Sequence, residues 1–285
     1  MSTTRFTTRL SSIPGWLEER HGMRWPLVVV YLALQLGLML ALLTFYTWFR
    51  KTYFLQPADE AFRNALDVID LQAWVGLPVE RVELPLQQWA IDAGIIDFFN
   101  SYYRLFKPML YVSAGACVVL APSAFRRIRR IFLLTTLIAF PTYALYPLAP
   151  PRLMTEFGYP FVDTVAISKG ISSTAMGAGS ANLYAAMPSM HIGWTTIGAL
   201  WIAAALPWKR VGAVIGVIHL SLMCLTVMIT ANHYWLDIVG GWVTVGAAWL
   251  IARQLPAHIA WPWSRSFAPS HRLQHDVARR PGHVD

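Results

Sequence analysis

Charged residues are scarce in this chain, and so are cysteines. Only 13% of the 285 residues are Asp, Glu, Lys or Arg, whereas 56% are hydrophobic and the mean hydropathy is +0.44. Soluble globular domains carry about 25% charged residues, so this composition excludes an ordinary soluble domain. Cys117 and Cys224 both fall inside apolar runs, which argues against a disulfide framework and a cysteine-based metal site.

The sequence also lacks the features of a cleavable secretory signal. The apolar run at residues 26–49 is too long for one, and no small-residue cleavage site closes it. The formal net charge of +8 comes from basic residues that flank the apolar runs, as expected of topology signals and contacts with anionic lipid. We therefore expect membrane lipids as partners and no nucleic acid.

The apolar residues gather in runs of the length that crosses a bilayer. They predict an all-α fold: a polytopic membrane protein whose six-transmembrane-helix bundle, residues 26–252, is the catalytic domain. A cytoplasmic segment, residues 1–25, precedes it, and a basic, disordered cytoplasmic tail, residues 253–285, follows. The six predicted spans are residues 26–49, 105–121, 131–147, 192–206, 211–230 and 236–252.

Two long segments between the spans are too polar to cross. Residues 50–105 hold most of the acidic residues, and their hydrophobic residues recur at helical spacing, which predicts amphipathic interfacial helices between the first and second spans. Residues 153–186 are rich in Gly, Ser and Ala and predict a loop, which would be a lid, a substrate entrance or a plain linker. A basic loop is predicted at residues 125–130. The expected apolar faces are Phe62, Leu66, Ile69 and Ala73, and Leu86, Trp89, Ala93 and Ile96 or Asp97.

The positive charges indicate which side faces the cytoplasm. Six spans place both termini on one side, together with 15 of the 23 Lys and Arg residues. The positive-inside rule makes that side cytoplasmic. Residues 50–105 and 153–186 are then extracytoplasmic.

Three short polar stretches, each beside an apolar run, fall on the outer face in this topology. They are residues 146–152, 187–191 and 231–237. The last contains His233 and Asp237, four residues apart, a spacing that places both side chains on one face of a helix. An Asp that accepts a hydrogen bond from one ring nitrogen leaves the other nitrogen basic, ready to attack or to take a proton.

These residue types suit attack on a phosphate ester. Arg152 offers a planar fork for phosphate oxygens, and Ser189 adds a hydroxyl beside the backbone N–H groups at the start of the fourth span. His191 would protonate the departing alkoxide while His233 forms a phosphohistidine. His219 lies midway along the fifth span, and we assign it to packing or a helix–helix hydrogen bond.

Two alternatives from other classes stay open. His191, His233 and Asp237 match the ligands of a two-histidine, one-carboxylate metal site, although the adjacent Arg152 would repel a cation. The second alternative is that the chain is a transporter or a scaffold that catalyses no reaction. We expect no metal and no cofactor.

Pro188-Ser189-Met190-His191 and residues 233–237 resemble the second and third signatures of the type-2 phosphatidic acid phosphatase superfamily. Residues 182–191 and 146–152 look more like its inositol-phosphotransferase branch, which includes the fungal inositol phosphorylceramide synthases. The resemblance covers about residues 58–252. It implies a six-helix bundle, no metal, and a triad in which His233 is the nucleophile, Asp237 orients it and His191 is the general acid.

Two features depart from the superfamily pattern. The first signature, which runs from a Lys to an Arg-Pro pair, is absent, and Arg152 is our proposed substitute. Thr226-Val227 stand where the third signature begins with Ser-Arg, so one phosphate-binding arginine is missing.

The sequence therefore predicts a membrane phosphotransferase at the extracytoplasmic face. It would move a phospho-alcohol such as inositol phosphate from a lipid-linked ester to a lipid or alcohol acceptor. The alternative is a lipid phosphate phosphatase, acting on phosphatidate or on polyprenyl phosphate or diphosphate, with water as acceptor. Further substrate contacts are predicted at Tyr146, Asn182, Tyr184, Asn232 and Tyr234.

Overall fold

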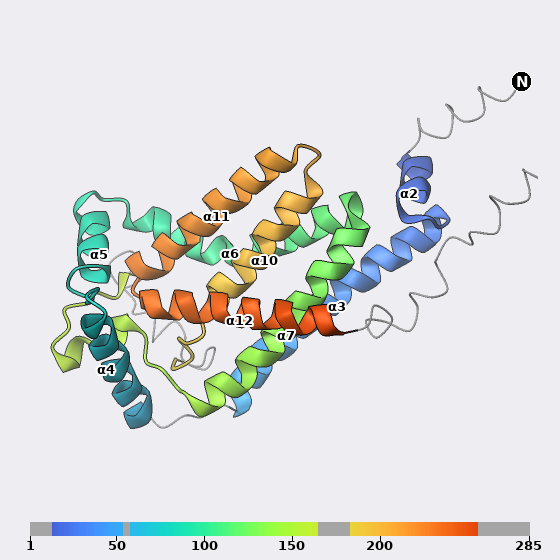
Figure 1. Ribbon diagram of the computed structural model, residues 1–285. Coiled ribbons are helices and arrows are strands. Elements are labelled where there is room, and N and C mark those ends of the chain that lie inside the picture. Colours follow the sequence, from blue (N-terminus) through green and yellow to red (C-terminus); the bar gives the residue numbers. More distant parts are fainter. Residues whose placement is uncertain (1–12, 54–57, 165–182, 256–285) are drawn as a thin grey trace, which may run out of the picture. The chain divides into compact units, whose positions relative to one another are not determined.

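The computed structural model describes residues 13–53, 58–164 and 183–255 (Figure 1). Within these ranges the regular elements are helices, which confirms the all-α class. One isolated parallel bridge pairs Leu148 with Ala185. The helices are α2 (Ile13–His21), α3 (Trp25–Tyr53), α4 (Ala58–Trp74), α5 (Glu83–Asp92), α6 (Ile96–Leu120), α7 (Pro122–Leu145), the short turns η1 (Pro151–Leu153) and η2 (Thr155–Phe157), α10 (Met190–Ala205), α11 (Lys209–Ile229) and α12 (Trp235–Gln254).

Four of these helices are long and apolar enough to cross a membrane: α3, α7, α11 and α12. Their length and composition mark the chain as an integral membrane protein. The apolar helix α10 has 16 residues, and α6 has 25 but includes Asp97, Arg104 and Lys107. The count of six spans and the side on which each terminus lies stay predictions.

The basic segment 125–130 is not a loop, as the sequence had suggested, but lies inside α7. Pro122 occupies the first turn of that helix, where its missing N–H removes no hydrogen bond. Arginine has a high helix propensity, so four arginines continue the helix beyond the apolar run.

The inner faces of α4 and α5 differ from those expected. In α4, Ile69 is buried as predicted, but Ala73 is exposed. In α5 the predicted Trp89 is exposed, whereas the polar Glu83 and Gln87 are buried. The expected face of the second stretch is only partly correct: Ile96 is buried and Leu86 packs against a buried cluster, whereas Trp89 and Ala93 are exposed. Whether α4 and α5 lie on the membrane surface stays a prediction.

Residues 34–254 form one compact unit, which holds every site residue discussed below. Of the other unit the structure describes residues 13–33 and Leu255, and there the Trp25 backbone N–H donates to Glu18 Oε1 at 3.0 Å. Within residues 34–254, α10 contacts α6, α7, α11 and α12, so it is the central helix of the bundle.

Small residues set the closest helix approaches. A Cβ added to Gly216 of α11 would lie 2.9 Å from the Ala199 carbonyl oxygen of α10. A Cβ on Gly241 of α12 would lie 2.7 Å from the Ser189 carbonyl oxygen, closer than a real side chain tolerates. Because Gly241 has no side chain, the start of α10 packs directly on α12, and this contact brings the polar stretches 187–191 and 231–237 together.

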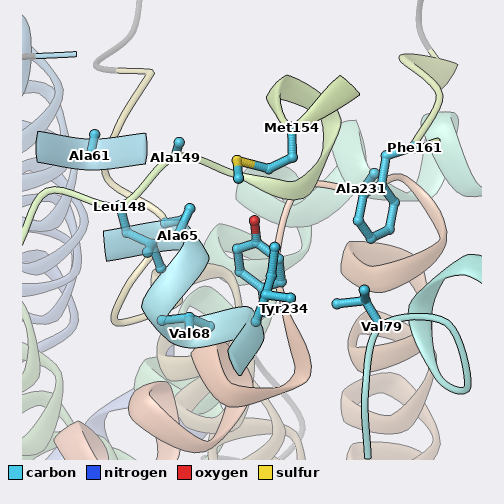
Figure 2. Close-up of a cluster of buried hydrophobic side chains, with 12 residues drawn as sticks. Ala61, Ala65, Val68, Val79, Leu148, Ala149, Met154, Phe161, Ala231 and Tyr234 are labelled. Atoms are coloured by element: carbon cyan, nitrogen blue, oxygen red, sulfur yellow. The ribbon is translucent and has the colours of Figure 1, made fainter. Parts of the chain in front are cut away.

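A hydrophobic cluster joins α4 to the loops around the third polar stretch (Figure 2). Figure 2 shows Tyr234 among the cluster residues, with its hydroxyl end pointing toward Met154. The cluster fixes these loops against α4. Its buried members are Ala61, Ala65, Val68, Ile69, Val79, Leu148, Ala149, Met154, Phe161, Ala186, Ala231 and Tyr234.

Candidate active site

Backbone hydrogen bonds tie the three polar stretches to one another. The Leu148 N–H donates to the Tyr184 carbonyl at 2.7 Å, which links the first stretch to the residues before the second. The Arg152 N–H donates to the Ala231 carbonyl at 3.0 Å, and the Ser189 N–H to the Asp237 carbonyl at 3.1 Å. The stretches that the sequence placed at one face therefore meet through main-chain contacts.

His233 lies just before α12 and Asp237 in its first turn. His233 Nδ1 stands 3.2 Å from Asp237 Oδ2, and the Tyr234 N–H donates to the same oxygen at 3.0 Å. Asp237 has no exposed surface, and a carboxylate in the first turn also interacts favourably with the helix dipole. The carboxylate holds the Nδ1–H tautomer, so the lone pair of His233 stays on Nε2.

An unusual backbone turn presents His233. Ala231 has a φ of 50°, in the left-handed region, which costs a residue other than glycine about 1–2 kcal/mol. The Asn232 and His233 N–H groups both donate to the Val227 carbonyl, at 3.0 and 3.1 Å. The turn ends α11 and places the side chains of Asn232 and His233 on one cavity.

His191 stands at the start of α10, and its Nδ1 lies 3.1 Å from His233 Nε2. Its ring packs against two rings of α6, with centroid distances of 4.5 Å to Tyr103 and 4.7 Å to Phe106. Asp237, His233 and His191 thus form a continuous line of contacts.

Ser189 was predicted to bind phosphate, but the structure gives its hydroxyl another task. Oγ accepts a hydrogen bond from the Ile192 N–H at 3.4 Å and caps α10. Ser189 has no exposed surface and does not line the cavity, so the phosphate-binding role has no support here.

A cavity of about 240 Å³ opens onto the two histidines. At roughly 30 Å³ per water molecule, it has room for a phosphate and a small alcohol. Two cations, Arg152 and Lys107, line the cavity together with Asn232. The aromatic part of the cavity consists of Tyr46, Tyr103, Phe106, Tyr143 and Trp194.

A hydrogen bond to Asn232, which also lines the cavity, holds the Arg152 side chain in place. Its Nη1 donates to Asn232 Oδ1 at 2.5 Å, and Asn232 Nδ2 donates to Thr230 Oγ1 at 2.8 Å. Burial lowers the pKa of Arg152, while Tyr103 and Asp163 raise it; a guanidinium nonetheless stays protonated in proteins. A desolvated cation attracts an anion more strongly than a hydrated one does.

Most of the predicted substrate contacts lie elsewhere. Asn232 lines the cavity, but Tyr146, Tyr184 and Tyr234 do not. The Tyr146 hydroxyl donates to the Asn64 carbonyl at 3.4 Å, and the Tyr184 ring packs on Phe62.

Tyr234 has no exposed surface, and its burial raises its pKa well above the ordinary value. It is a core residue, so its position gives no support to the predicted substrate contact. Asn182 lies outside the described residues.

Three residues of the site lie on a helix from which the sequence analysis selected no site residue. Tyr103, Phe106 and Lys107 all belong to α6. A lysine inside an otherwise apolar run is by itself a sign of function in a membrane protein. Lys107 carries this sign, since it lies within the predicted span 105–121.

Within the described ranges, no group of three or more His, Cys, Asp or Glu residues is arranged to hold a metal ion. His233 uses Nδ1 on Asp237 and turns Nε2 toward His191, so these three residues do not converge on one point. The metal alternative gains no support from this geometry, and the metal-free expectation stays a prediction. His219 accepts or donates a 2.6 Å hydrogen bond with the Tyr102 hydroxyl, which confirms its helix–helix role.

A family model described as the PAP2 superfamily matches residues 66–251. No curated protein and no solved structure matches the chain. The matched range includes α5, α6, α7, α10 and α11 in full, together with Arg152, His191, His233 and Asp237. Membership suggests a phosphatase or phosphotransferase of lipid phosphates. Because the match spans more than half of the sequence, the chain belongs to the PAP2 superfamily.

Proposed function

We propose that this protein is a membrane phosphotransferase that works through a phosphohistidine on His233. It moves a phospho-alcohol, such as inositol phosphate, from a lipid-linked phosphate ester to a lipid or alcohol acceptor. The observation that supports this most is the line of contacts from Asp237 through His233 to His191 at a cavity lined by Arg152. The active site faces the extracytoplasmic side, and both termini are cytoplasmic.

In the first step, His233 Nε2 attacks phosphorus, an N–P bond forms and the bond from phosphorus to the lipid oxygen breaks. His191 gives a proton to the departing alkoxide, which leaves as an alcohol. Asp237 stabilises the positive charge that develops on the His233 ring.

In the second step, a hydroxyl group attacks the phosphohistidine. An O–P bond forms, the N–P bond breaks, and His191 takes the proton that the hydroxyl loses. Attack by a bound alcohol gives transfer, whereas attack by water gives hydrolysis. The aromatic side chains of the cavity offer an apolar surface on which an alcohol acceptor can pack, which supports transfer.

A lipid phosphate phosphatase is the second candidate, because superfamily membership suggests either activity. The same residues would act in the same order, with water as the acceptor. Only the group that reaches the phosphohistidine differs between the two.

Product analysis with purified protein tests the proposal. The full chain in detergent is given lipid phosphates and phosphodiesters with EDTA, with and without alcohol acceptors, and released phosphate and lipid products are followed together. We expect turnover in EDTA, a product that contains the acceptor, and a rate that depends on acceptor concentration. Hydrolysis with no acceptor dependence, which releases free phosphate from lipid phosphates and a phospho-alcohol from phosphodiesters, would identify the phosphatase. Loss of turnover in EDTA would contradict the metal-free mechanism.

Arg152→Lys is expected to lower kcat/KM by about 100-fold, although the charge is kept, because the planar two-point contact with phosphate oxygens is lost. Steady-state kinetics and competitive inhibition by vanadate measure the effect. Arg81→Lys, an exposed arginine before α5, is the matched control and should behave like wild type. Equal kinetics for Arg152→Lys and wild type would remove Arg152 from the phosphate site.

A further inference from the structure

Buried polar residues in the helices that precede the site bind the loops around it. Asn64 Nδ2 of α4 donates to the Pro147 carbonyl at 2.7 Å. Gln87 Nε2 of α5 donates to the Ile229 carbonyl at 3.1 Å, where α11 ends. Side chains of residues 58–100 therefore donate hydrogen bonds to one backbone carbonyl in the first polar stretch and to another just before the third.

Glu83 makes the most direct of these contacts. Its Oε1 accepts a hydrogen bond from the Trp235 backbone N–H at 2.8 Å and another from Gln72 Nε2 at 2.9 Å. Trp235 is the first residue of α12 and lies two positions from both His233 and Asp237. Its indole N–H donates to the Leu77 carbonyl at 3.0 Å, so main chain and side chain are both held. In Figure 1, α5 lies near the end at which α12 begins.

Glu83, Gln72 and Asp237 have no exposed surface, so the contact is shielded from water. In the part of the chain that the structure describes, Glu83 Oε2, Asp237 Oδ1 and the Tyr234 hydroxyl have no hydrogen-bond partner. Both N–H donors bind the same oxygen of Glu83, Oε1, and this oxygen therefore has its full set of hydrogen bonds. Glu83 also does not line the cavity, so it cannot touch the substrate.

Burial of Glu83 favours its neutral form. Burial raises the pKa of Glu83 above its ordinary value of 4.5, the hydrogen bonds from Trp235 and Gln72 lower it, and the charge of Asp237 raises it again. The other titratable groups nearby are Tyr234, with Tyr159 beyond it, and His233 on the far side of Asp237. A neutral Glu83 accepts both hydrogen bonds without adding a second negative charge beside Asp237.

We propose that Glu83 is a positioning residue for the reaction of His233. Its carboxyl group fixes the first turn of α12, and this sets the contact between Asp237 and His233. The inference rests on the proposed function and deepens it, because it gives the segment between the first and second predicted spans a task at the site.

Three substitutions test the role. Glu83→Ala removes the acceptor, and we expect kcat to fall by about 10- to 100-fold, as for other residues that orient a catalytic group, with little change in KM. Glu83→Gln keeps an uncharged acceptor for both N–H groups and should retain most of kcat. Glu80→Gln, an exposed acidic residue on the same segment, is the control and should match wild type.

The dependence of stability on pH provides an independent readout. Because the pKa of Glu83 is raised in the folded protein, its contribution to stability is complete below 4.5 and is lost as pH rises through the folded-state pKa. Glu83→Gln cannot titrate. Its thermal midpoint in detergent should therefore fall less than that of wild type between about pH 5 and about pH 8.

If Glu83→Ala fails to fold, Glu83→Asp takes its place, because a side chain shorter by one methylene withdraws the acceptor from the Trp235 N–H. Wild-type kcat in Glu83→Ala or Glu83→Asp would overturn the proposal, as would an effect on KM alone. If Glu83→Gln is as slow as Glu83→Ala, Glu83 does not act as a neutral hydrogen-bond acceptor. His233→Ala is assayed in parallel: if it stays active, the proposed function fails, whereas an inactive His233→Ala beside a fully active Glu83→Ala overturns this inference only.

Discussion

His233→Ala is expected to lower turnover of every accepted lipid phosphate by at least about 1,000-fold, as removal of a nucleophile does in other enzymes that use a covalent intermediate. The methyl side chain cannot form the N–P bond, and Asp237 is left without the ring that it holds at 3.2 Å. Initial rates with the best substrate from the product assay measure the loss.

The covalent intermediate gives a second, direct measurement of the same prediction. Wild type quenched during turnover of a substrate with radiolabelled phosphorus should carry acid-labile, base-stable label, and His233→Ala should carry none. His219→Gln is the matched control, since this buried histidine contacts Tyr102 rather than the cavity and Gln keeps a polar contact there. Label or turnover retained in His233→Ala would exclude His233 as the nucleophile.

His191→Ala should have the next largest effect, and the effect should depend on the leaving group. With a lipid phosphate the leaving alkoxide needs a proton, so we expect kcat to fall by about 100- to 10,000-fold. With p-nitrophenyl phosphate the leaving group needs none, so the first step should remain fast. The second step still needs a base, so p-nitrophenolate should appear in a burst equal to the amount of enzyme.

Stopped-flow absorbance follows this burst, and steady-state rates on both substrates give the ratio. His219→Gln again serves as the control and should show the wild-type ratio. Equal losses on the alkyl and aryl substrates, with no burst, would mean that His191 binds or orients the phosphate instead of moving a proton.

The sequence predicted those parts of the molecule that depend on local hydrophobic patterns and on motif spacing. The helices over residues 192–206, 211–230 and 236–252 appear as α10, α11 and α12 within a few residues. The four-residue spacing of His233 and Asp237 predicted a contact that the structure shows. Each of these expectations rests on neighbours along the chain.

What the sequence did not predict depends on partners that lie far away along the chain. Glu83 and Gln87 are buried, and their hydrogen-bond partners, Trp235 and Ile229, lie at helix ends about 150 residues away, so no periodicity reveals such partners. Lys107 reaches the cavity because α6 packs against α10, which a charge in an apolar run does not show by itself. The hydroxyl of Ser189 was assigned to phosphate although it also fits an N-cap, which is its observed role.

The 3.1 Å contact between His191 Nδ1 and His233 Nε2 has a consequence for ligand selection. The two nitrogens satisfy one another, so any ligand that separates them gives up one hydrogen bond, worth about 0.5–1.5 kcal/mol. An oxyanion recovers this free energy by accepting the proton that His191 offers, whereas an uncharged ligand of the same shape without an acceptor does not. The resting pair of imidazoles therefore discriminates between ligands by about two- to tenfold before any chemistry begins.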